Sequence, residues 1–270
     1  MSETDRFEFG KNWKAFLASL DQQRIERAVE SLRQTLGVES MEGKRFIDLG
    51  CGSGLFSLAA HQLGAEVTSI DFDMESVHCT EFLRDNYAAE SPIWSIRQGS
   101  VLDASFLASL GQGDFVYSWG VLHHTGAMQD AIALVSERTR VGGHFLISIY
   151  NDQGGASRRW LRIKQSYNRL PSWLRPGLVL LVASCYELKF AVARLLRFKN
   201  PSPRRDWQAK KADRGMSAWH DWVDWVGGLP FEVAQPEQII EPLRQRGFVL
   251  EKLKTVGNGW GCNEYLFTRQ

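Results

Sequence analysis

Apolar residues near the start of the chain recur at helical spacing and then give way to short apolar runs. In residues 7–36 they return every three or four positions, which predicts an amphipathic helix ending at Gly37. Beyond it, short apolar runs alternate with helical segments up to residue 150, which predicts a parallel sheet with helices on both faces. We expect strands at residues 45–49, 66–70, 93–98, 114–118 and 144–150, and helices at residues 55–63, 74–89 and 128–140, the last closed by Gly142 and Gly143.

The alternation stops after residue 150. A segment rich in Arg, Trp, Pro and Gly runs to about residue 235 with an irregular pattern. A helix at 236–246 and an antiparallel strand pair at 248–256 and 264–269 should follow. The predicted fold is α/β, a doubly wound Rossmann-like seven-stranded sheet, mostly parallel with an antiparallel C-terminal strand. The expected domains are a helical arm (1–42), a central domain (43–150 and 236–270) and an inserted cap or lid (151–235).

Composition narrows the function only a little. The 270 residues carry a formal net charge of +1, without the basic excess that nucleic-acid binding requires. Four cysteines are scattered without a C-x-x-C pair, so neither a disulfide framework nor a zinc site is expected. The chain begins with polar residues and contains no uninterrupted apolar run of about 18 residues, so we expect a cytoplasmic protein. Its oligomeric state is left open.

The strongest chemical signal is a glycine-rich turn at residues 46–54, Phe-Ile-Asp-Leu-Gly-Cys-Gly-Ser-Gly. It follows an expected strand and opens an expected helix. Glycines let the backbone turn sharply and approach a ligand closely, and the helix N-terminus offers unpaired N–H groups. Asp71 ends the next strand, at about the spacing where an acid meets ribose hydroxyls in nucleotide-binding units.

The spacing of the glycines separates two classes of ligand. Dinucleotide sites use G-x-G-x-x-G, whereas here Gly54 comes one residue early and Leu55 takes the last position. Asp48 precedes Gly50 by two residues, and its carboxylate would repel a pyrophosphate but suit an ammonium group. With this motif, about residues 43–150 and the C-terminal strand pair resemble class I S-adenosylmethionine-dependent methyltransferases. Within that family the core is similar to small-molecule and ubiquinone-pathway O-methyltransferases.

The resemblance implies S-adenosyl-L-methionine as the cofactor and a set of contacts for it. Asp71 would bind the ribose diol, Phe72 would lie beside the adenine, and the segment from Ser100 would frame the adenine. Many relatives carry an acid in place of Ser100, so the adenine-amine contact stays open; Asp103 either supplies it or caps the following helix. The full implied set is Asp48, Gly50, Cys51, Gly52, Gly54, Asp71, Phe72, Ser100, Val101, Leu102 and Trp119.

Candidate acid–base groups lie where the later strands end. His123 and His124 follow the fourth strand, and a histidine there can accept a hydroxyl proton or only cap the loop. Asp152 follows the fifth strand and either orients a histidine, holds the acceptor or forms a turn. His220, in the aromatic segment 216–231, is a further candidate base or part of a packed helix. The sequence contains no evident cluster of carboxylates, so a metal site is not expected.

Methyl transfer to a hydroxyl of a small molecule is therefore the expected reaction. A sugar or glycan, a quinone precursor or another secondary metabolite would each suit as acceptor. A nitrogen or lipid-linked acceptor, or a regulatory protein that binds the cofactor without transfer, remains an alternative. A dehydrogenase is disfavoured by Leu55 and Asp48.

An apolar run at residues 178–198 has basic residues on both sides. It either packs beneath the lid or touches a membrane surface, which would make the protein peripheral to a membrane. Packing is favoured because Glu187 and Lys189 interrupt the apolar face. In that case Leu181 and Leu188 should be buried.

Overall fold

The computed structural model describes residues 17, 20–88, 92–196, 198, 200, 202, 218–257 and 259–270. The chain divides into two compact units. The core unit contains the described residues up to 153 and those from 230 on, and the insert unit contains those between 154 and 229. Each unit is described by itself.

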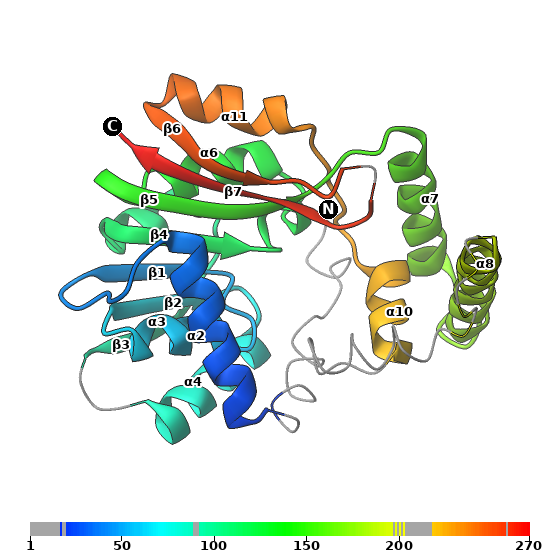
Figure 1. The fold of residues 1–270 in the computed structure, drawn as a ribbon, viewed down its shortest axis with the longest axis horizontal. Coiled ribbons are helices and arrows are strands. Elements are labelled where there is room, and N and C mark those ends of the chain that lie inside the picture. Colours follow the sequence, from blue (N-terminus) through cyan, green and yellow to red (C-terminus); the bar gives the residue numbers. More distant parts are fainter. Residues whose placement is uncertain are drawn as a thin grey trace. The chain divides into compact units, whose positions relative to one another are not determined.

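The core unit contains one seven-stranded sheet, which confirms the predicted fold class. Its order is β3-β2-β1-β4-β5-β7-β6 (Figure 1). Strands β1 to β5 pair in parallel, and β7 runs antiparallel to β5 and to β6. The strands are β1 (Arg45–Leu49), β2 (Glu66–Asp71), β3 (Trp94–Gln98), β4 (Gly113–Trp119), β5 (Thr139–Tyr150), β6 (Phe248–Lys254) and β7 (Cys262–Arg269).

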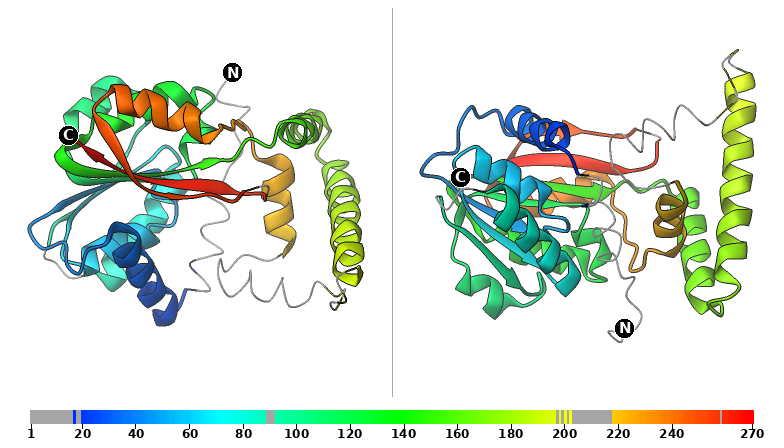
Figure 2. Two further views of the ribbon diagram at one scale, coloured as in Figure 1. Left: turned by 45° about the horizontal axis from the view of Figure 1, so that its top comes forward. Right: turned by 90° about the horizontal axis from the view of Figure 1, so that it is seen from below.

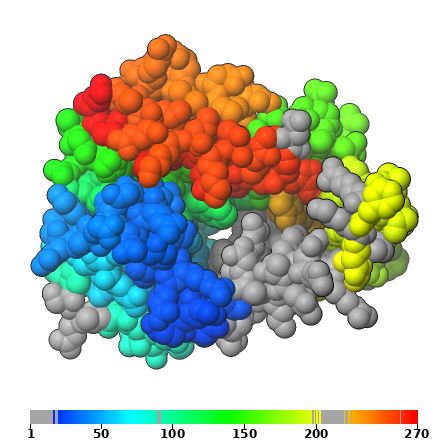
Figure 3. Space-filling model, in the orientation of Figure 1, coloured from blue at the N-terminus to red at the C-terminus, as the bar shows by residue number. Residues whose placement is uncertain are grey.

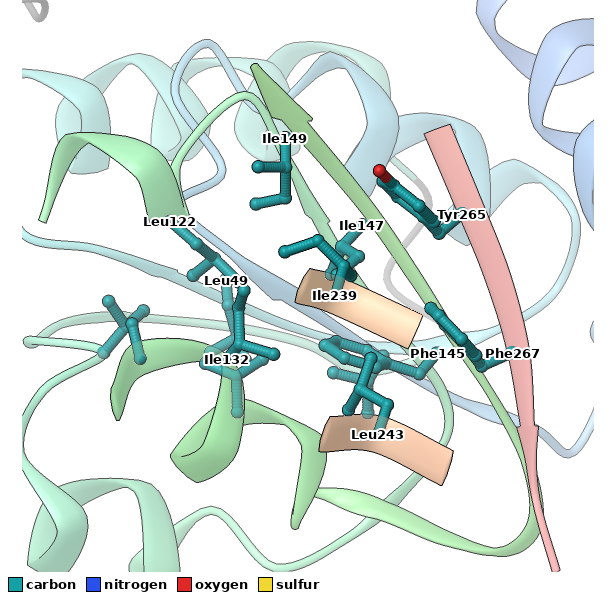
Figure 4. Close-up of a cluster of buried hydrophobic side chains, with 14 of the residues drawn as sticks. Leu49, Leu122, Ile132, Phe145, Ile147, Ile149, Ile239, Leu243, Tyr265 and Phe267 are labelled. Carbon is teal, nitrogen blue, oxygen red and sulfur yellow. The ribbon is translucent and has the colours of Figure 1, made fainter. Parts of the chain in front are cut away.

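Helices cover both faces of this sheet. One face packs against α2 (Gln22–Leu36), α3 (Leu55–Gln62) and α4 (Met74–Tyr87). The other packs against α5 (Ala104–Ser109), α6 (Met128–Ser136) and α11 (Pro236–Gln245). Figure 4 shows the second core, where Phe145 and Ile147 of β5 meet Ile132 of α6 and Ile239 of α11. Because β1, β4 and β5 are buried on both sides, their sequences are nearly continuous in apolar residues.

Two predicted helix boundaries are wrong. The helix expected at 128–140 ends at Ser136, and Gly142 and Gly143 lie inside β5. A Cβ on Gly143 would lie 2.9 Å from the carbonyl oxygen of Asp114, so this glycine permits close approach of two strands and does not end a helix. The helix expected at 7–36 is interrupted: Leu17 is helical, Leu20 is not, and α2 begins at Gln22, where the Asp21 side chain caps it by accepting a hydrogen bond from the Arg24 N–H.

The described part of the insert unit is largely helical, so the expectation of an irregular segment is wrong for those residues. It contains α7 (Gly155–Arg169), α8 (Arg175–Leu195) and α10 (Ala218–Gly227), which are shown in Figure 2. The ring of Trp160 on α7 stacks on Tyr186 of α8 at 5.1 Å and lies 5.9 Å from Trp225 of α10. The amphipathic pattern of α7 was missed because a buried lysine, Lys164, occupies one of its inward positions.

In the described part of the chain, no helix combines the length and the apolar character needed to cross a lipid bilayer.

Candidate active site

Most of the predicted cofactor residues meet at one edge of the sheet. The glycine loop follows β1, Asp71 is the last residue of β2, and Trp119 is the last residue of β4. The segment Ser100 to Leu102 comes just after β3. These strands are parallel neighbours, so their carboxyl ends lie together at the edge where doubly wound sheets bind ligands.

The loop after β1 follows a path that requires glycine. Gly50, Gly52 and Gly54 have φ values of 86°, 56° and 81°, in the left-handed region. A Cβ on Gly54 would lie 2.9 Å from the Cα of Thr80, and one on Gly50 would overlap the Val121 side chain. The loop is thus pressed against its neighbours, and side chains at Gly50 and Gly54 would not fit.

Asp48 ends a chain of buried hydrogen bonds. The Trp94 indole N–H donates to Ser69 Oγ over 2.8 Å. Ser69 Oγ donates to Ser57 Oγ over 2.7 Å, and Ser57 Oγ donates to Asp48 Oδ2 over 2.6 Å. All four side chains are buried. The chain fixes one oxygen of the carboxylate and links β1 to α3, β2 and β3.

The other oxygen of Asp48 is buried and unsatisfied. Among the described residues, Oδ1 is buried without a hydrogen-bond partner. Burial raises the pKa of Asp48 to about 7, against the lowering effect of the Ser57 hydrogen bond. A cationic donor next to Oδ1 would satisfy the oxygen and favour the ionised form. The ammonium group of a methionine moiety has this chemistry.

Asp71 is held by backbone groups at the end of β2. Its Oδ2 accepts the Gly52 N–H and its Oδ1 accepts the Asp73 N–H, each at 2.9 Å. Burial raises its pKa to about 6, while these hydrogen bonds act in the opposite direction. Each carboxylate oxygen has more than one acceptor position, so ribose hydroxyls can be added to these bonds. The neighbouring Phe72 side chain is exposed.

The segment after β3 is shaped by its own side chains. Ser100 Oγ accepts the Leu102 N–H at 3.1 Å, Val101 is buried in the core, and Leu102 is exposed. Asp103 Oδ1 accepts the Phe106 N–H at 2.9 Å. Because of this bond, the pKa of Asp103 is lowered, and the residue caps α5, which is one of the two roles left open above.

Cys51 lies inside the glycine loop. Its Sγ is 3.2 Å from Thr80 Oγ1, and burial raises the pKa of the thiol well above its ordinary value. The side chain therefore stays neutral and ties the loop to α4.

The two adjacent histidines occupy different environments in the short 3₁₀ helix η2 (Leu122–His124). The His123 ring is buried and lies 3.9 Å from the ring of Tyr150. His124 is half-buried, and its Nδ1 lies 2.6 Å from the carbonyl oxygen of Pro230. A carbonyl only accepts hydrogen bonds, so Nδ1 carries the proton and the lone pair of the neutral ring is on Nε2.

A distant segment positions this helix, and no sequence signal had indicated it. The Glu232 N–H donates to the His123 carbonyl at 3.0 Å, and the Glu232 carboxylate accepts the N–H groups of Gly126 and Met128. Residues 230–232 therefore hold the histidine loop from more than 100 positions away along the chain.

For two further predicted site residues, Asp152 and His220, the structure gives the position of the backbone. The Asp152 N–H donates to the Ala234 carbonyl, and its own carbonyl accepts Gln235 Nε2 at 2.7 Å, so its backbone is anchored just beyond β5. His220 lies on α10 of the insert unit, and its side chain is outside the described residues. Within the described residues no group of His, Cys, Asp or Glu could hold a metal ion.

Fold and site together define a class of protein. The sheet order with a reversed last strand, the glycine loop, the acid ending β2 and the unsatisfied Asp48 oxygen fit S-adenosyl-L-methionine in a class I methyltransferase domain. The profile of a family described as "Methyltransferase domain" matches residues 20–251. The chain belongs to this family, and its cofactor is S-adenosyl-L-methionine.

Individual relatives agree with this assignment. The chain is similar to the ubiquinone biosynthesis O-methyltransferase of Cupriavidus pinatubonensis, with 26% identity over 115 residues, 43% of this chain and 45% of the relative. It also resembles the mitochondrial ubiquinone biosynthesis O-methyltransferase of Schizosaccharomyces pombe, with 24% identity over 163 residues, 55% of this chain and 54% of the relative. The chain thus matches about half the length of these relatives. Among solved structures, magnesium protoporphyrin IX methyltransferase from Synechocystis PCC 6803 with bound SAH shares the fold, with TM-score 0.52, 15% identity and coverage of 92% of this chain and 83% of that one.

Proposed function

We propose that this protein transfers the methyl group of S-adenosyl-L-methionine to a hydroxyl group of a small molecule, with His124 as general base. The observation that carries the proposal is the buried Asp48 oxygen beside the glycine loop, which needs a cationic partner. The O-methyltransferase relatives support oxygen as the acceptor atom over the half of their length that matches.

The cofactor would be held at three points. Asp48 would receive the ammonium group, Asp71 would receive the ribose hydroxyls, and the segment from Ser100 would border the adenine. Gly50, Cys51, Gly52 and Gly54 would offer their backbone to the methionine end, and Phe72, Val101, Leu102 and Trp119 would supply the apolar contacts. When bound, the cofactor supplies an electrophilic methyl group, so the residues of this chain need only position the acceptor and remove its proton.

His124 is the better candidate base because its tautomer is fixed. The Pro230 carbonyl holds the proton on Nδ1, which leaves Nε2 as the basic atom of the neutral ring. His123 is buried against Tyr150, so it serves better as support for the loop. Asp152, beyond β5, would hold the acceptor hydroxyl, and His220 would act only if the insert reaches the acceptor.

Methyl transfer can be tested with labelled cofactor and a panel of hydroxylated aromatic compounds, sugars and amines. His124→Ala should lower kcat about a hundredfold or more, because a general base contributes at least this much, while the affinity for S-adenosylhomocysteine stays unchanged. His78→Ala is a matched control, since His78 is an exposed histidine on α4. Full turnover by the His124 variant would assign proton removal to another group.

The same panel separates the alternatives. Transfer of the labelled methyl group to amines but not to alcohols would show that the acceptor atom is nitrogen. Lipid-linked alcohols added to the panel would reveal a lipid-linked acceptor. Binding of the cofactor without transfer to any member of this enlarged panel would favour a regulatory protein that uses the cofactor only as a signal.

A further inference from the structure

The helix α8 presents an apolar face to the surface of the insert unit. Residues 181, 185, 188, 192 and 195 follow one another at spacings of three and four, so they lie on one side of the helix. We call this set, together with Leu196, the α8 stripe: Leu181, Cys185, Leu188, Val192, Leu195 and Leu196. All six side chains are exposed, and Figure 3 shows part of α8 in yellow at the molecular surface.

This exposure corrects the expectation that the apolar run is packed. Leu181 is 62% exposed and Leu188 is 67% exposed, whereas burial had been expected for both. The residues that do pack lie on the opposite side of the helix. Tyr186 stacks on Trp160, and Phe190 lies 6.4 Å from Tyr186 between ring centroids. Glu187 and Lys189 lie outside the stripe, so no charged residue interrupts it.

The stripe is unusual for a folded surface. Of the twenty large apolar side chains exposed in the described residues, nine lie between Trp173 and Phe198. Contiguous exposed apolar surface of this kind marks a contact with another apolar body. Trp173, exposed just before the helix, has the amphipathic ring that favours the interface between lipid and water.

The net charge of the insert unit indicates what kind of partner contacts the α8 stripe. Residues 154–229 contain fifteen of the 32 Lys and Arg residues but only five of the 31 Asp and Glu residues, a net charge of +10 in a chain whose total is +1. In the described stretch 154–196, Glu187 is the single acid beside eight basic residues. A second copy of the insert would bring the same positive charge and be repelled. An anionic lipid surface offers both negative headgroups and an apolar interior.

We propose that the α8 stripe docks the protein on the surface of an anionic membrane. The helix would lie in the plane of the interface, with Leu181, Leu188 and Val192 inserted among the acyl chains and basic residues of the insert near the headgroups. This contact needs no cofactor and no acceptor, so it is separate from methyl transfer.

Vesicle cosedimentation tests the docking with the full-length protein. Binding to vesicles of phosphatidylcholine with phosphatidylglycerol should exceed binding to pure phosphatidylcholine about tenfold or more, and it should fall with added salt. The double variant Leu181→Gln/Leu188→Gln should bind about tenfold or more weakly with an unchanged melting temperature, because both side chains are already exposed. Val141→Gln is the matched control, an exposed apolar residue of the core unit.

A second measurement does not depend on the folding of a double variant. Cys185 lies in the stripe and is exposed, whereas Cys51 and Cys79 are buried. In the Cys262→Ser protein, a polarity-sensitive dye on Cys185 should shift to the blue when anionic vesicles are added. The proposal is overturned by any of three results: no vesicle binding, binding that survives the double variant, or a concentration-dependent dimer that the double variant abolishes.

Discussion

Replacing Asp48 with asparagine should weaken cofactor binding while stabilising the protein without cofactor. The ionised carboxylate is buried with one oxygen unsatisfied, and its pKa rises from an ordinary 3.8 to about 7. A change of one pKa unit corresponds to about 1.4 kcal/mol, so ionisation of this group costs up to about 4 kcal/mol in the folded state. Asparagine removes this charge but leaves its amide to be satisfied, so we expect a net gain of about 1–3 kcal/mol at pH 8.

The sign of this effect depends on pH. Between about pH 4 and pH 7 the folded protein keeps Asp48 protonated while the unfolded chain ionises, so the free energy of unfolding falls as pH rises through this window. The cost is complete above pH 7 and absent below about pH 4. Asp48→Asn should therefore raise the melting temperature by a few degrees at pH 8 and change it little at pH 5.

Cofactor binding should change in the opposite direction. A charge-assisted hydrogen bond to the ammonium group contributes about 1.5–3 kcal/mol, so the affinity for S-adenosylhomocysteine at pH 8 should drop about 10- to 150-fold. In the wild type that affinity should rise with pH through about 7, and in the variant this dependence should disappear.

Calorimetric titration and thermal melting at pH 5 and pH 8 measure both effects. Asp130→Asn, an exposed acid in the first turn of α6, controls for the loss of one negative charge. Wild-type affinity in the Asp48 variant would refute the contact with the ammonium group. A melting temperature at pH 8 lower than that of the wild type would refute the raised pKa.

Two further predictions concern the same loop and its neighbour. Gly54→Ala should lower the free energy of unfolding by about 1–3 kcal/mol and weaken cofactor binding, because the new Cβ meets Thr80. Gly142→Ala is the control, since Gly142 has a similar φ of 74° but open space around it, so this variant measures the backbone strain alone. An equal loss of stability in both variants would contradict the clash. Asp71→Ala should weaken binding of both adenosine and S-adenosylhomocysteine by about 1–3 kcal/mol, whereas Asp48→Asn should leave adenosine binding unchanged. Calorimetric titrations with both ligands test this. An adenosine affinity unaffected by Asp71→Ala would place the ribose contact elsewhere.

The sequence by itself determined the layers of the core unit and the class of cofactor. The glycine loop, Asp48 and Asp71 form a local signal, because β1, its turn, α3 and β2 follow one another within about 30 residues and their geometry depends mainly on backbone requirements. The alternation of short apolar runs with helical spacing likewise predicts a doubly wound sheet without knowledge of side-chain contacts.

Only the tertiary structure decided which side chains meet and which faces remain exposed. The chain of hydrogen bonds that runs from Trp94 through two serines to Asp48, and the bond between His124 and Pro230, join residues that are separated in the sequence. Nothing local encodes such pairings. The amphipathic pattern of α7 was not recognised because Lys164 takes a buried position. Its ammonium group donates to the Trp225 carbonyl over 2.7 Å, a contact that exists only after the helices pack. The α8 stripe shows the same limit: a strongly apolar run predicts that some face is buried, but which face depends on the helices packed against it.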